Sequence, residues 1–223
     1  MEICLNITIG IIQLKLQILK REICIHANNK ELSLMRKKVS IFLCVLYVVF
    51  MAFVAVQLFL KDNDSDALIA LSGVACGLIP LLIILLTKFE LSLPIIIFYL
   101  VFLFGSQFLG SLQGFYRNGW WDSFMHLISG ILIAIFGFDL YKRLLRKDHI
   151  SHLSPWFVSL FILSFAVFGG VLWEIYEFTM DNLFEMGLQG GGNLDTMTDL
   201  ITDSLGGLII SIWSFFKSKM FIQ

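Results

Sequence analysis

Long apolar stretches recur along this chain, and they constrain its fold more than any other feature. A helix needs about 20 mostly apolar residues to cross the hydrocarbon core of a bilayer. Six stretches meet that requirement, over residues 39–60, 67–87, 91–112, 121–141, 155–180 and 197–216. Lipid offers no partner to a backbone N–H or C=O group, so spanning segments of this kind form helices. The sequence therefore predicts an all-α, polytopic membrane helix bundle with about six transmembrane helices.

The composition agrees with a membrane location. Hydrophobic residues make up 58% of the chain and charged residues only 15%, whereas a soluble domain carries about 25% charged residues. The net charge of -1 gives no indication of a nucleic-acid partner. We expect the lipid bilayer to be the main partner, in a bacterial cytoplasmic (inner) membrane.

Basic residues lie in alternate connections between the spans. They precede the first span at residues 36–38 and follow the second at Lys88, the fourth at residues 142–147 and the sixth at Lys217. The other connections are acidic or nearly neutral. Because cytoplasmic loops carry an excess of Lys and Arg, both termini are expected in the cytoplasm.

The segment before the first span, residues 1–38, is expected to be separate from the membrane domain of residues 39–216. Between Ile3 and Ile18 apolar residues mostly alternate with polar ones, which is typical of a strand. Two interpretations stay open. The segment is either a poorly ordered leader upstream of a natural start at Met35, or a cytoplasmic segment that lies on the membrane. Residues 217–223 are expected to form a short cytoplasmic tail.

Ionisable side chains gather at one end of the last three spans. The set comprises Asp122, His126, Glu174, Glu177, Asp181, Asp195, Asp199 and Asp203. Helical spacing puts the members within each span on one face. With the termini in the cytoplasm, the deepest of them lie about 6–10 Å below the outer boundary. Ionisable groups within spans are costly and usually functional. We therefore predict a shared site that opens outward.

Some of these residues have a plain structural alternative. Asp199 could complete a capping box with Thr196, and Asp122 could serve the dipole of its helix. His126 and Asp122 could form a structural pair, and Asp181 could be a solvated interfacial residue. Two residues, Glu174 and Asp203, lie deeper than any cap requires. The leading site residues, as catalytic groups or metal ligands, are His126, Glu174, Glu177, Asp199 and Asp203, and the secondary ones are Asp122, Asp181 and Asp195.

The charge balance of this set restricts its chemistry. Several carboxylates around one imidazole cannot all ionise in a pocket of low dielectric constant without a cation. Either a divalent metal ion neutralises them or some of them hold protons. A set rich in carboxylates favours Mg²⁺, Mn²⁺ or Ca²⁺, with Zn²⁺ as a further option. The cysteines show no metal-type spacing, and the common nucleophile and phosphate-loop motifs are absent.

The order of these residues resembles a known group of proteins. Its elements are Asp122-x-x-x-His126, Glu174-x-x-Glu177, Gly190, Asp195-Thr196-x-x-Asp199 and Gly206. Over about residues 95–215 this order resembles the uncharacterised bacterial inner-membrane proteins of the YjdF type and, more distantly, the VanZ-like proteins. The chain departs from the YjdF type at Asp203, and from the VanZ-like pattern at Glu177 and Asp203, which makes its site more acidic. The resemblance implies a membrane helix bundle and no particular activity.

Three functions are consistent with the sequence. The first is a metal-assisted or acid/base hydrolase or transferase that acts on a lipid-linked or envelope substrate at the outer leaflet. The second is a proton-coupled transporter, although the inner halves of the last three spans are apolar apart from Asp139. The third is a structural or interaction protein whose polar cluster locks the helices together. Whether the cluster holds metal or protons separates these alternatives.

Overall fold

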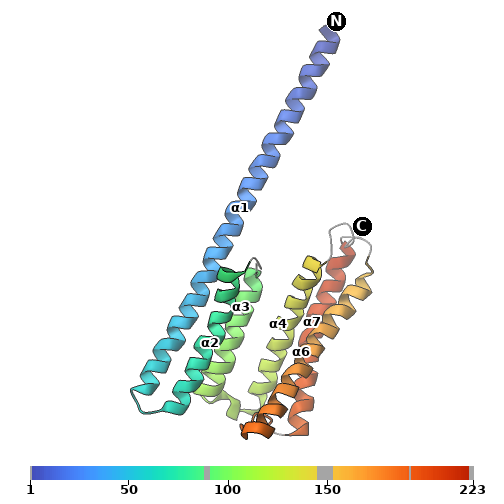
Figure 1. Cartoon of the computed structure of the whole chain (residues 1–223). Coiled ribbons are helices and arrows are strands. Elements are labelled where there is room, and N and C mark those ends of the chain that lie inside the picture. The colour runs from blue at the N-terminus through green and yellow to red at the C-terminus, as the bar shows by residue number, and fades with distance from the viewer. Residues whose placement is uncertain (1, 88–90, 145–152, 191, 221–223) are drawn as a thin grey trace. The chain divides into compact units, whose positions relative to one another are not determined.

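The computed structural model describes residues 2–87, 91–144, 153–190 and 192–220, and in those ranges every regular element is a helix (Figure 1). Two compact units are present, residues 1–43 and residues 44–223. The elements are α1 (Glu2–Phe59), α2 (Asp64–Leu86), α3 (Leu93–Leu103), η1 (Phe104–Leu112), η2 (Phe115–Arg117), α4 (Gly119–Leu144), α6 (Pro155–Phe184) and α7 (Asn193–Met220).

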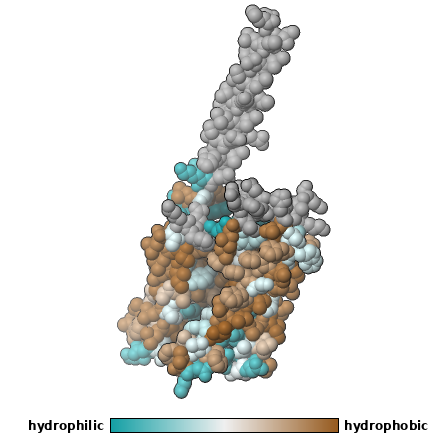
Figure 2. Space-filling model, turned by 45° about the vertical axis from the view of Figure 1, so that its right-hand side comes forward, coloured by the Kyte–Doolittle hydropathy of each residue, from teal (hydrophilic) through white to brown (hydrophobic). Residues whose placement is uncertain are grey.

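The predicted helix bundle is confirmed. Within the described residues, 6 helices are long and apolar enough to cross a membrane. Their outer surface agrees with this, because many large apolar side chains are exposed, such as Phe42, Leu86 and Trp156. Figure 2 shows hydrophobic residues over most of the visible body of the second unit. Such a surface is stable only when hydrocarbon covers it.

The structure of α1 corrects the expectation of a strand near the N-terminus. The alternating stretch from Ile3 to Ile18 lies inside α1 and forms no strand. Apart from Gly10 the helix contains neither glycine nor proline, so nothing stops it between Glu2 and Phe59. The proposed leader and the proposed surface segment are not distinguished by this helix.

One group of helices, which we call the N-terminal group, comprises residues 44–59 of α1 with α2, α3 and η1. Its core contains Tyr47, Met51 and Leu103. Glycine allows α1 and α2 to approach, because a Cβ at Gly73 would lie 2.5 Å from Met51 Cε and one at Gly77 would lie 2.6 Å from Tyr47 Cδ1. The Gly73-x-x-x-Gly77 spacing, which puts both glycines on one face of α2, is typical of such close contacts between membrane helices.

The third span changes its helix type in the middle. From Phe104 to Leu112 the backbone forms a π-helix, and Gln113 N–H donates to Phe108 C=O at 2.9 Å. The Gly110-x-x-x-Gly114 pair at the end of this span does not join two helices. Gly110 accommodates the ring of Tyr116, and Gly114 has a φ of 73° in the turn that follows. Both glycines therefore serve the turn into α4.

The second group, which we call the C-terminal group, comprises α4, α6 and α7, and these three helices pack mainly against one another. Its core contains Ala134, Phe138, Ile162 and Ala166. Proline at the first position of α6 suits a helix start, because its missing N–H would have no partner there. All eight ionisable residues singled out from the sequence lie on these three helices.

Candidate functional site

The start of α4 presents three polar side chains to α7. Asp122 and His126 lie one turn apart on α4, and Ser129 follows within the next turn. The first turn of the helix is aromatic, and Trp121 Nε1–H donates to Gly105 C=O in η1 at 3.3 Å. This contact fixes the start of α4 against the N-terminal group. The His126 ring is buried, with 6% of the residue exposed.

Two glycines bring α4 and α7 close together at this level. A Cβ at Gly130 would lie 2.2 Å from Asp203 C=O, and one at Gly206 would lie 2.3 Å from Leu127 C=O. No side chain larger than hydrogen fits at either position, because the obstacle is backbone in both cases. The close approach puts Asp199 and Asp203 of α7 directly against the polar face of α4.

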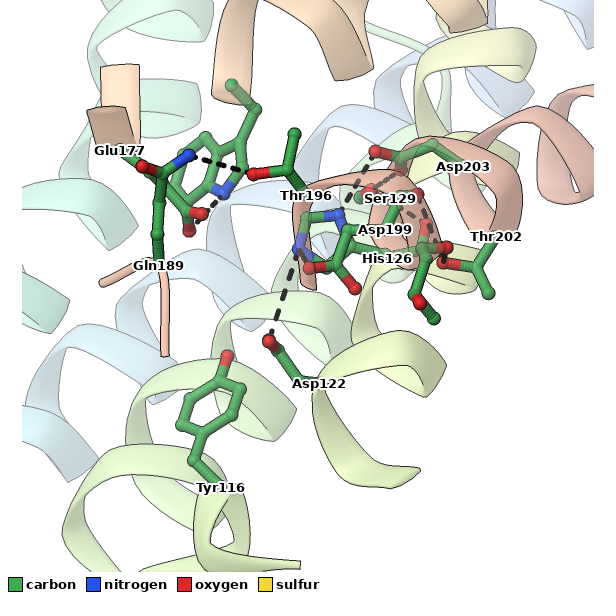
Figure 3. A network of polar contacts seen from close by, with 12 residues as sticks. Tyr116, Asp122, His126, Ser129, Glu177, Gln189, Thr196, Asp199, Thr202 and Asp203 are labelled. Atoms are coloured by element: carbon green, nitrogen blue, oxygen red, sulfur yellow. Dashed lines mark hydrogen bonds and ion pairs between the residues drawn. The ribbon is translucent and has the colours of Figure 1, made fainter. Parts of the chain in front are cut away.

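His126 lies at the centre of this contact (Figure 3). Its Nδ1 is 3.0 Å from Asp203 Oδ2, and Ser129 Oγ donates to the other oxygen of Asp203. Its Nε2 is 3.9 Å from Asp122 Oδ1 and 3.9 Å from Asp199 Oδ2. Asp203 therefore holds the ring on one side, and two further carboxylates face the ring on the other side.

Buried carboxylates here lack partners of their own. Asp199 is 1% exposed and Glu174 is 6% exposed. Among the described residues, no hydrogen bond of good geometry reaches Oδ2 of Asp199 or either oxygen of Glu174, although the hydroxyl of Thr196 faces Glu174. A buried carboxylate with so few partners is costly, and it points to a group that the polypeptide does not supply.

The end of α6 brings Glu174 to the same level. A Cβ at Gly170 would lie 2.7 Å from Asp203 Oδ2, so α6 meets α7 closely at that point. Glu174 follows Gly170 by one turn of α6, and Asp199 precedes Asp203 by one turn of α7. Since α6 and α7 run in opposite directions, Glu174 lies at the level of Asp199.

The other acidic residues of α6 have local contacts. Glu177 Oε1 accepts a hydrogen bond from Trp173 Nε1–H at 2.8 Å. Asp181 accepts from the backbone N–H groups of Leu188 and Gln189, at 2.6 and 2.8 Å, and so closes the turn after α6. Asp181 therefore has a structural role in this turn, although it is half-buried and bonded to backbone rather than solvated. Glu177 remains a candidate site residue, but its carboxylate would have to break the hydrogen bond with Trp173 to reach the cluster.

The start of α7 rules out the capping box. The helix begins at Asn193, so Asp199 lies well inside it, and Thr196 Oγ1 accepts from Gln189 Nε2–H at 2.8 Å. Capping therefore does not explain the buried carboxylate of Asp199. Asp195 is half-buried in the first turn, where a negative charge suits the helix dipole.

Three of the residues have the spacing of metal ligands. One donor atom each from Asp122, His126 and Asp199 lies within 4.8 Å of the others. Two donors that each lie about 2.1–2.4 Å from one ion can be no more than about 4.8 Å apart, so the trio fits a single cation. We call Asp122, His126 and Asp199 the cation trio. Asp122, expected to be secondary, belongs to it, whereas Glu174, Glu177 and Asp203 lie outside it.

The structure adds residues that the sequence did not single out. Ser129 belongs to no recognisable sequence motif, yet its hydroxyl bonds Asp203. Gly130 is required by the backbone contact with Asp203. The available signal was the helical spacing of Asp122, His126, Ser129 and Gly130, which puts them on adjoining positions of one face.

Comparison with known proteins agrees with the fold. Residues 41–219 match the family described as Predicted membrane protein (DUF2238). An uncharacterized protein of Thermotoga maritima is 37% identical over 106 residues, which cover 45% of this chain and 53% of that protein. The matched region is therefore about half the length of this relative. No solved structure matches the chain. Since the family match includes every membrane span from the second to the sixth, the chain belongs to the DUF2238 family of predicted membrane proteins.

Proposed function

We propose that this protein binds a divalent cation at the cation trio and acts as a metal-assisted hydrolase or transferase on a lipid-linked or envelope substrate. The observation that carries the proposal is the imidazole of His126, which has Asp203 on Nδ1 and two carboxylates 3.9 Å from Nε2. A ligating histidine commonly gives its second N–H to a carboxylate in this way. The family match and the six spans support the membrane setting.

Each residue of the site has a distinct task in this proposal. Asp203 accepts the Nδ1 proton of His126, which leaves the lone pair of Nε2 directed towards Asp122 and Asp199. Ser129 holds the second oxygen of Asp203 and so fixes its carboxylate plane. Asp122, whose side chain is 33% exposed, forms the open side at which a substrate enters. When bound, a cation would polarise a carbonyl or phosphoryl oxygen of that substrate.

Glu174 is the proposed acid/base group. It is buried at the level of Asp199, where the hydroxyl of Thr196 faces its carboxylate and no hydrogen bond of good geometry from a described residue reaches its oxygens. Such a carboxylate is free to take a proton from an attacking water or hydroxyl and to return it to the leaving group. Glu177 would assist at the open side once Trp173 releases it. In this proposal Glu174 contributes mainly to the chemical step and less to cation binding.

The orientation belongs to the same proposal. Loop charges favour a bacterial cytoplasmic membrane with both termini inside and the acidic cluster outside. A periplasm-active reporter fused after Gly190 should be active, and one fused after Leu144 should be inactive. The reverse pattern would put the cluster on the cytoplasmic side. The resemblance to YjdF-type and VanZ-like proteins is consistent with this arrangement but adds no activity to it.

Metal content tests the proposal directly. Purified protein should retain about one divalent ion per chain, lose it to a strong chelator together with thermal stability, and recover on return of one preferred ion. Asp199→Asn and His126→Gln should abolish retention. Asp62→Asn is the matched control, because Asp62 is an exposed turn residue with a φ of 56° that asparagine tolerates. Wild-type protein without metal would overturn the proposal.

One observation favours an alternative in which the polar cluster has only a structural role. The bonds of Asp203 to His126 and Ser129 join residues 74 and 77 positions apart and so hold α4 to α7. If the cluster only locks these helices, chelators should change nothing, and neutral substitutions at Asp199 should leave the protein as stable or more stable. A proton-coupled transporter, the other alternative, would require that proton movement across vesicles depends on Asp199 and Glu174.

A further inference from the structure

A second recess lies between α2, α3 and α4, apart from the acidic cluster. Its volume is about 240 Å³. Walls come from all three helices, and they include Ile79 and Ile83 of α2, Ile95 and Tyr99 of α3, and Leu132 and Phe136 of α4. We call this recess the apolar cleft. The cleft lies between the N-terminal group and the C-terminal group. The helices of these two groups pack less extensively against each other than the helices within the C-terminal group do.

No polar atom faces the apolar cleft. Tyr99 is a lining residue with a polar group, but its hydroxyl donates to Cys76 C=O at 3.0 Å and is therefore already paired. A cavity of about 150 Å³ lined by leucine, isoleucine and phenylalanine stays dry and takes up apolar molecules. The cleft is larger than that and equally apolar, so water is not its occupant.

The cleft is continuous with the surface that faces the bilayer. Ile79 on its rim is 49% exposed, and the neighbouring Leu82 and Ile97 are 47% and 42% exposed. In a protein with six membrane-spanning helices these side chains contact hydrocarbon. An acyl chain can therefore enter from the bilayer without crossing any polar barrier.

We propose that the apolar cleft is a binding site for one hydrocarbon chain of a membrane lipid. An empty apolar recess forfeits dispersion contacts along its whole lining, and a flexible chain restores them. The surroundings favour an acyl chain as the occupant, because the cleft opens on the surface that faces hydrocarbon and presents no polar atom to a peptide or a headgroup.

Filling the cleft tests this site. Native mass spectrometry in mild detergent should find about one retained lipid per wild-type chain. Ile83→Trp and Leu132→Trp place bulk in the cleft from opposite walls, and each should lower lipid occupancy roughly tenfold. Leu82→Trp is the control, because Leu82 neighbours Ile83 on α2 and faces outward, so occupancy should stay as in wild type. An equal loss in all three variants would overturn the proposal.

Photolabelling gives a second measurement on unmodified protein. A phospholipid with a diazirine in the middle of its acyl chain should label residues 79–83, 95–99 and 132–136 in preference to other apolar surfaces. Leu132→Trp should suppress that preference. Labelling spread evenly over all exposed apolar faces would overturn the proposal, and so would cross-links between two copies of the chain through the cleft. Neither measurement depends on the cation, so the two experiments test the lipid site independently of the proposed activity.

Discussion

The two helix groups differ in the charge of the polar side chains between their helices. In the N-terminal group these side chains are neutral: Ser72 Oγ donates to Gln107 Oε1 at 3.0 Å, Tyr99 Oη donates to Cys76 C=O, and the buried hydroxyl of Tyr47 has no partner among the described residues. In the C-terminal group they include a histidine and carboxylates, and three oxygens of Glu174 and Asp199 make no hydrogen bond of good geometry with the described residues. The N-terminal group therefore packs without buried acids, whereas the C-terminal group contains several.

This difference supports the proposed site in the C-terminal group. A buried neutral group that bonds its neighbour contributes modestly to stability, whereas an unpartnered carboxylate reduces stability. Natural proteins keep such costly groups mainly where a ligand or a reaction needs them. The contrast between the groups can be tested with single substitutions, because each group offers its own matched control.

The largest effect is expected at the contact of α4 with α7. Gly130→Ala puts a Cβ 2.2 Å from Asp203 C=O, and backbone on both sides leaves little room to relax. We expect the free energy of unfolding to fall by about 1–3 kcal/mol, measured by thermal unfolding in detergent. Gly119→Ala is the control on the same helix, since no atom lies within 4 Å of its Cβ. Equal stability of both variants would refute the close contact.

Substitution of Glu174 should separate stability from function. Glu174→Gln removes a poorly partnered buried charge, so the cation-free protein should gain about 1–3 kcal/mol of stability. Cation retention should change little, while turnover, once a substrate is known, should be lost. Gln107→Leu in the N-terminal group is the counterpart, and it should lower stability because it breaks the bond with Ser72. A loss of stability in Glu174→Gln would show that this carboxylate has a structural partner.

Asp203 should act on the cation through His126. Asp203→Asn keeps the size of the side chain but weakens its hold on Nδ1, so cation affinity should fall about 10–100-fold, measured by titration of chelator-treated protein. Asp139→Asn is the control at the other end of α4, where Asp139 pairs with Lys142 at 2.8 Å. Unchanged affinity in Asp203→Asn would mean that His126 is oriented by other contacts.

The sequence predicted the spans, because an apolar run of membrane length has essentially one solution in lipid. It also predicted that Asp199 and Asp203 share a face of one helix and lie near His126 of another, and the structure brings these three side chains together. It treated Asp122 as secondary, although Asp122 lies beside His126, and it could not identify Ser129 or Gly130 as contacts. Their importance depends on how α4 rotates against α7, and that angle follows from interhelical packing that spacing within one helix does not contain.

Two other features were outside the reach of sequence patterns. The π-helix of η1 depends on a shift of backbone hydrogen bonds that leaves no mark in the spacing of apolar residues. The alternation between Ile3 and Ile18 suggested a strand, but it lies in a helix with glycine at only one position and no proline. A period of two over a short stretch is weak evidence when the following segment is helical and nothing separates them.

The smallest effect is expected where two helices of the C-terminal group share neutral bonds. Ser159 and Ser211 join α6 to α7, with 2.7 Å between their hydroxyl oxygens and 2.7 Å from Ser211 Oγ to Ser159 C=O. Ser211→Ala should lower stability by about 0.6 kcal/mol, the average for such bonds in membranes. Ser72→Ala tests a bond of the same kind in the N-terminal group and should have a similarly small effect. Cation retention should be unchanged in both variants, because neither serine belongs to the cation trio. Loss of the cation in Ser211→Ala alone would extend the functional site into the other half of α7 and would weaken the distinction between packing bonds and functional acids.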